Sequence, residues 1–206
     1  MVTVAQGLAP ATNVLTNNSD GTSNFTLNGL IPVASGWEQV VGWGNAAGKA
    51  SKTGVSISKF SGANGTGTLL SKLVNSSDNT SLLVEYSFSK SSGIMSRTSL
   101  YSGVNASGTL RAQEINYSNG TSVLVLNNAG QTGSNIVSIC ETDTYSRWDA
   151  MGTLLSKLVN TVYKDGTYSN TQSVNTPSSG IANTTNYFSS NKKLQYTISN
   201  LTSGGS

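Results

Sequence analysis

The chain has 206 residues, of which 10% are charged, and its formal net charge is +3 with no histidine. The length suits one domain, and the charged fraction lies far below the roughly 25% of ordinary soluble domains. Without an imidazole, Ser-His-Asp triads and His-containing metal sites are excluded, and the scattered basic residues do not form the patch that nucleic-acid binding requires. Abundant Gly, Ser, Thr and Asn instead favour an all-β protein with many turns.

The first eleven residues predict an N-terminal arm. Val2 and Val4 alternate with polar residues, Leu8 follows, and Pro10 ends the run, which is typical of a short strand joined by a flexible turn. Such a strand gains backbone hydrogen bonds by pairing with the open edge of a neighbouring sheet. We therefore expect a homo-oligomer held through sheet edges and through the arm 1–11.

Short alternating runs predict about eight to ten strands, because each run is bounded by polar turn residues. They include FTLNGLIPV at 25–33, KTGVSISKF at 52–60, LLVEYSFS at 82–89, TLRAQEINYS at 109–118 and TSVLVLNN at 121–128. The pair Asn119-Gly120 lies between two such runs and is a strong hairpin signal. Regular spacing of this kind predicts an antiparallel β-sandwich or jelly roll over residues 12–198, followed by a flexible tail at 199–206.

The nonapeptide GTLLSKLVN occurs at 67–75 and again at 152–160. Around the second copy, apolar residues at alternating spacings of 3 and 4 predict an amphipathic helix over about 147–164. Its packing residues would be Trp148, Met151, Leu155, Leu158 and Val162. Glycines before the first copy limit any helix there to about two turns from Thr68. The sequences that flank the two copies resemble each other only over a short stretch, so we interpret the pair as a local duplication with a shared structural role. A diverged, duplicated half-sandwich is the alternative.

No cofactor or metal is expected. GANGTG at 62–67 has the glycine spacing of a phosphate-binding loop, but Thr68 stands where that loop needs lysine. Among the acids, Glu85 and Glu114 on predicted strands are the candidates for carboxylate catalysis, and we expect both to face solvent instead.

Two further features at the middle of the chain have ordinary explanations. Glu141, Asp143 and Asp149 are close enough in sequence for a calcium site, but the glycine-centred loop of an EF-hand is missing. The single cysteine, Cys140, lies in a strand-like run and is expected to behave as a small buried hydrophobe.

Aromatic residues offer a second kind of contact, because flat rings can stack on sugar faces. Tyr101 and Tyr117 stand beside turn residues and are the candidate glycan contacts, whereas Trp37 and Trp43 are expected in the core. Asn-x-Ser/Thr sequons, typical of glycosylated surface proteins, occur at Asn17, Asn24, Asn64, Asn75, Asn79, Asn105, Asn116, Asn119, Asn183 and Asn200.

The composition is typical of an extracellular surface, whereas the chain starts with Met and has neither the pattern of a signal peptide nor an apolar stretch that could span a membrane. We therefore expect a non-enzymatic structural or attachment protein of an extracellular particle. A self-assembling virion component, such as a capsid, decoration or tail-fibre protein, is the first choice. A subunit of a cell-surface filament or adhesin is the alternative, and a glycan-binding module is third.

Overall fold

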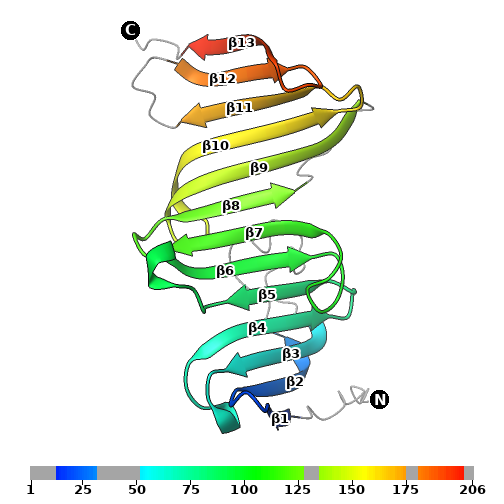
Figure 1. Ribbon diagram of the computed structural model, residues 1–206, viewed down its shortest axis with the longest axis vertical. Coiled ribbons are helices and arrows are strands. Elements are labelled where there is room, and N and C mark those ends of the chain that lie inside the picture. Colours follow the sequence, from blue (N-terminus) through cyan, green and yellow to red (C-terminus); the bar gives the residue numbers. More distant parts are fainter. Residues whose placement is uncertain (1–12, 32–51, 128–134, 175–180, 202–206) are drawn as a thin grey trace, which may run out of the picture. The chain divides into compact units, whose positions relative to one another are not determined.

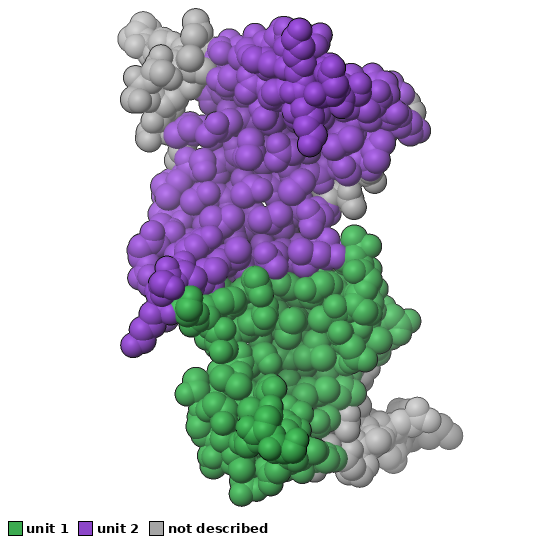
Figure 2. Space-filling model, in the orientation of Figure 1, with its two compact units in different colours: residues 1–89, 96–109 green, residues 90–95, 110–206 purple. Residues whose placement is uncertain are grey.

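The computed structural model describes residues 13–31, 52–127, 135–174 and 181–201. The chain divides into two compact units (Figure 2): unit 1 comprises 1–89 and 96–109, and unit 2 comprises 90–95 and 110–206. The predicted boundaries of a domain at 12–198 and a tail at 199–206 stay predictions. The arm residues Val2, Val4 and Leu8, as well as Trp37 and Trp43, lie outside the described residues.

The described residues are mainly β, which confirms the predicted class (Figure 1). The strands are β1 (Asn13–Asn17), β2 (Ser23–Ile31), β3 (Lys52–Phe60), β4 (Leu69–Ser76), β5 (Ser81–Glu85), β6 (Ile94–Tyr101), β7 (Leu110–Tyr117), β8 (Ser122–Asn127), β9 (Ile136–Arg147), β10 (Met151–Tyr163), β11 (Tyr168–Val174), β12 (Ile181–Phe188) and β13 (Leu194–Leu201). Two single 3-10 turns, η1 (Ala63–Gly65) and η2 (Lys90–Ser92), are the helical elements of this part of the chain. None of its helices is long and apolar enough to cross a membrane.

Within each unit, consecutive strands pair antiparallel in chain order. Unit 1 carries β1 to β5 and β6 from Ser96 onward, and unit 2 carries β7 to β13. The described strands of a unit therefore form one meandering sheet, and they do not form the two packed sheets of the predicted sandwich or jelly roll. The sequence signals are the same for both architectures, since each consists of short strands and tight turns.

The predicted helix over 147–164 is wrong, because this segment is the end of β9 and the 13-residue strand β10. Leu158 pairs with Thr142 on one side and Gln172 on the other, so β10 is a central strand. Apolar residues on both faces of a strand produce spacings of 3 and 4 as well as of 2, which is why the helix pattern was misleading. Backbone pairing of β10 with β9 on one side and β11 on the other then favours a strand over a helix.

Few hydrophobic side chains of the described residues are buried. In unit 1, Val74, Leu82 and Leu100 occupy neighbouring positions across β4, β5 and β6 and form one buried row. In unit 2, Ala112 and Leu124 are the buried hydrophobic residues of the described part. Many buried side chains are serines, and their positions follow a repeated arrangement.

The first copy of this arrangement joins the tight turn between β1 and β2 to the wide loop between β3 and β4. The Ser23 hydroxyl donates to the Gly62 carbonyl (2.6 Å) and accepts from the Gly65 amide (2.8 Å). Asn17 and Asn64 bond reciprocally: the Asn17 side-chain amide donates to Asn64 Oδ1 (2.8 Å), and Asn17 Oδ1 accepts from the Asn64 backbone amide (2.7 Å). We call this docking of a wide loop on a tight turn a turn–loop joint.

The same joint occurs three times. In the second, Ser81 bonds the Gly103 carbonyl and the Ala106 amide while Asn75 pairs with Asn105. In the third, Ser122 bonds the Arg147 carbonyl and the Ala150 amide while Asn116 pairs with Asp149. The joints recur every three strands from β1 to β10, so the described residues of this part of the chain repeat a three-stranded motif.

The wide loops at 61–68, 102–109 and 146–153 share one conformation. Each is closed by a hydrogen bond of 2.9 Å from the amide of its last residue, a threonine, to the hydroxyl of its first, a serine. The glycine before the threonine has a positive φ, +80° at Gly67, and a Cβ there would lie 2.4 Å from Ser61 Oγ. The Asn or Asp at the fourth position also has a positive φ, which those residue types tolerate best after glycine.

The duplicated nonapeptide is explained by these repeats. In both copies, Gly-Thr ends a wide loop and the remaining seven residues belong to the next strand. Phe60 pairs with Leu69 beside a bulge, and Tyr145 pairs with Leu154 beside the equivalent bulge. The prediction of a shared structural role is confirmed, but that role is a strand and not a helix.

Candidate functional site

A charged cluster lies on one face of β9 and β10 in unit 2. Glu141 and Asp143 are two residues apart on β9, and Lys157 is directly opposite Asp143 on β10. The Lys157 Nζ lies 2.5 Å from Glu141 Oε1, and the Tyr145 hydroxyl lies 3.4 Å from Asp143 Oδ2. One amine thus faces two carboxylates, of which Asp143 is only 6% exposed.

Burial raises the pKa of Asp143, and the neighbouring Glu141 carboxylate raises it further, while Lys157 acts in the opposite direction. Burial also raises the pKa of Tyr145, with a smaller contribution from Asp143. The cluster thus combines the Glu141–Lys157 ion pair with a buried carboxyl group on the same sheet face.

We expect Asp143→Asn to increase stability at pH 7 and to remove part of the pH dependence of unfolding. The folded state raises the pKa of Asp143, so this group favours folding at low pH, and its contribution is lost as the pH rises through the folded-state pKa. Denaturant unfolding of both proteins between pH 4 and 7 measures the effect. The two stability curves should differ most at neutral pH and approach each other in acid; a constant difference would contradict the assignment.

The proposed calcium ligands do not come together as one group. Asp149 belongs to the third joint, where it bonds Asn116, and the described residues contain no cluster of three potential metal-binding side chains. The two candidate catalytic acids lie in different units. Glu85 in unit 1 pairs with Arg97 at 2.7 Å. Glu114 in unit 2 is only 2% exposed, so the expectation that it faces solvent is wrong.

The other candidate residues have ordinary positions. Tyr101 and Tyr117 are half-buried, and the Tyr117 carbonyl accepts a hydrogen bond from the Trp148 indole (2.6 Å). Cys140 is half-buried on β9 and is a free thiol. The segment 62–67 is part of a wide loop, in which Gly65 and Gly67 have a positive φ.

The residues predicted to pack a helix are instead partly exposed. Trp148 is 44% exposed, Met151 57% and Leu155 40%. Trp148 and Met151 occupy loop positions that hold Ala63 and Thr66 in the first wide loop. The loop conformation therefore does not require large apolar side chains at these two positions.

Several sequons are also explained by the joints. The side chains of Asn17, Asn64, Asn75, Asn105 and Asn116 are bonded to their joint partners. The Thr or Ser of the loop sequons has its own role, as in the Thr66 hydroxyl that donates to the Ala63 carbonyl. These sequons therefore have a structural explanation in the repeated hydrogen bonding of the joints.

Sequence reasoning missed the repeat, although a signal was present. The three wide loops read SGANGTGT, SGVNASGT and SRWDAMGT, with Ser, Asn or Asp, Gly and Thr at fixed positions. The two identical nonapeptides stand out, whereas the middle copy, GTLRAQEIN, shares only four of its nine letters with them.

No family model, curated protein or solved structure matches this chain.

Proposed function

We propose that the protein is a non-enzymatic structural or attachment protein that assembles with copies of itself on an extracellular particle, with a virion component as the first choice. The observation that carries this proposal is the imbalance between buried and exposed apolar side chains. Five hydrophobic residues of the described part are buried, while fifteen large ones are exposed. A sheet normally covers its apolar face with a second layer, and exposed apolar surface is typical of interaction sites.

The C-terminal strand supports association through an edge. β13 pairs with β12, and the described residues provide no strand on its other side. Leu194, Tyr196 and Ile198 on this strand are exposed. An open strand with exposed apolar side chains is a template for another strand, which also suits the alternative of a filament or adhesin subunit.

We expect the purified chain to form a defined oligomer at micromolar concentration. Sedimentation velocity gives its mass, and electron microscopy shows whether the oligomer is a closed ring or shell or an open filament, which separates the capsid-like from the filament-like form. Removing residues 1–11 should leave the circular dichroism spectrum unchanged but reduce the oligomer size. A monomeric full-length chain would contradict self-assembly, and unchanged assembly of the truncated chain would contradict only the role of the arm.

A further inference from the structure

The tight turn between β10 and β11 in unit 2 closely resembles the tight turns of the three joints. The Asp165 Oδ1 atom accepts hydrogen bonds from the Thr167 amide (2.9 Å) and hydroxyl (2.6 Å), as Asp20 does from Thr22 in the first joint. The backbone bond from Tyr163 to Thr167 also matches that from Asn18 to Thr22.

This fourth turn has no wide loop to hold. Val162 and Tyr168 stand where the joints have their Asn and Ser, and β12 is joined to β13 by a second tight turn, with a bond of 2.9 Å from the Ser189 amide to the Lys193 carbonyl. Tyr168 instead stacks on Phe188, with ring centroids 4.4 Å apart. Unlike the tight turns of the three joints, this turn therefore does not hold a wide loop.

A cavity of about 440 Å³ opens beside this turn, a volume within the range of small-molecule sites. Its lining residues are Asn135, Tyr163, Lys164, Asp165, Thr167 and Tyr187. Tyr187 is held by stacking on Tyr196, with centroids 4.5 Å apart, and the Tyr163 hydroxyl lies 3.2 Å from the Ser169 hydroxyl. Two tyrosines with positioned side chains thus line the cavity together with Asp165, Asn135 and Lys164.

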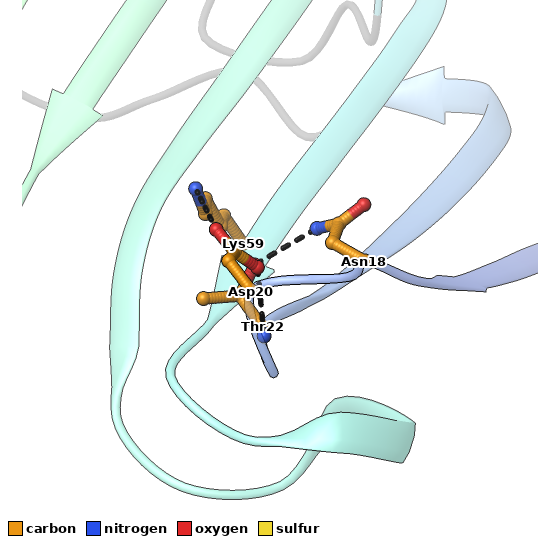
Figure 3. A network of polar contacts seen from close by, with 4 residues as sticks. All are labelled: Asn18, Asp20, Thr22 and Lys59. Atoms are coloured by element: carbon orange, nitrogen blue, oxygen red, sulfur yellow. Dashed lines mark hydrogen bonds and ion pairs between the residues drawn. The ribbon is translucent and has the colours of Figure 1, made fainter.

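The first turn provides an internal comparison (Figure 3). The strand registers place Lys59, opposite Asn24, at the position equivalent to Tyr187, opposite Ser169. The Lys59 Nζ atom lies 3.9 Å from Asp20 Oδ2, so the lysine forms an ion pair with that carboxylate. In the fourth turn a tyrosine replaces the lysine, and no cation of the described residues forms an ion pair with Asp165, which is one of the residues that line the cavity.

From this arrangement we propose that the cavity binds a neutral sugar ring. The apolar face of a pyranose can stack on a tyrosine, while its hydroxyls donate to the outer oxygen of Asp165 and bond the Asn135 amide and the Lys164 amine. Hydrogen bonds from Thr167 lower the pKa of Asp165, which keeps the carboxylate charged and a strong acceptor. Asp165 and Lys164 carry opposite charges, so neither an anionic nor a cationic sugar is favoured.

The test uses the full chain and the methyl glycosides of glucose, galactose, mannose and N-acetylglucosamine, with N-acetylneuraminic acid and glucosamine as charged probes. Saturation-transfer NMR should show at least one neutral glycoside bound through its ring protons, with a Kd on the order of 1 mM in titration. Asp165→Asn should weaken that binding about tenfold. This variant keeps the turn, because Asn119 makes the same two bonds to Thr121 in the third joint.

Asp20→Asn is the matched control, because it makes the same change in the first turn, where Lys59 forms an ion pair with the carboxylate. This variant should bind the sugar like the natural chain. Tyr187→Lys, which reproduces the first turn, should abolish binding while thermal unfolding verifies the fold. The proposal is overturned if no neutral sugar binds, if only a charged probe binds, or if Asp165→Asn and Asp20→Asn behave alike. It does not rest on self-assembly, which is measured separately by sedimentation.

Discussion

Leu100→Ala should lower the free energy of unfolding by about 2 to 5 kcal/mol, the usual range for removing a buried leucine side chain. Leu100 is 1% exposed and lies across from Leu82, which is itself next to Val74 on the neighbouring strand. Few other buried hydrophobic residues are present in the described part, so little apolar packing can compensate for the cavity. Urea unfolding followed by tryptophan fluorescence and circular dichroism measures the change.

Leu155→Ala is the matched control, because it removes the same atoms from a side chain that is 40% exposed. At a protein concentration low enough to keep the chain unassembled, its cost should stay below about 1 kcal/mol. Similar losses for both variants would show that Leu155 is as well packed as Leu100, which would contradict the exposure of the β9–β10 hairpin.

Ser81→Ala should cost about 2 to 4 kcal/mol, an unusually large effect for so small a change. The Ser81 side chain is fully buried, and its hydroxyl bonds the Gly103 carbonyl and the Ala106 amide. Alanine leaves both backbone groups without this partner, and each buried group left unpaired costs about 1 to 3 kcal/mol. Thermal or urea unfolding measures the loss.

The equivalent variants Ser23→Ala and Ser122→Ala should have comparable costs, since both serines are also fully buried and make the same pair of bonds. Ser77→Ala changes an exposed serine of the neighbouring turn and should have little effect. If all four variants unfold alike, the serine hydroxyls do not hold the loops.

The strand class was predictable from the sequence, whereas the layer arrangement was not. Alternation and turn residues identified the strands at 52–60 and 122–127, because period-two patterns and Asn-Gly turns depend on local geometry. The helix predicted over 147–164 was wrong, since β10 lies between two partner strands and carries apolar residues on both faces. Whether a chain forms one sheet or two depends on contacts that no local pattern encodes.

The site residues show the same division. The loop signature around Asn64, Asn105 and Asp149 is visible in the sequence when the three copies are aligned. It is visible because the loop conformation favours Ser, Asn or Asp, Gly and Thr at fixed positions. The position of Tyr163 and Tyr187 around one cavity with Asp165 could not be predicted, since it depends on the register of β11 with β12. Tyr101 and Tyr117 were chosen for their turn neighbours, and proximity to a turn does not place a ring beside polar partners.

The central claim, that one turn–loop joint is used three times, is tested most directly by amide hydrogen exchange measured residue by residue with NMR. Nine backbone amides of the wide loops donate their hydrogen bonds to side-chain oxygens and not to a neighbouring strand. They are the amides of residues 64, 65, 68, 105, 106, 109, 149, 150 and 153. The account predicts that all nine exchange slowly, with similar protection at equivalent positions of the three loops. Rapid exchange of these amides, at the rate of an open loop, would contradict it.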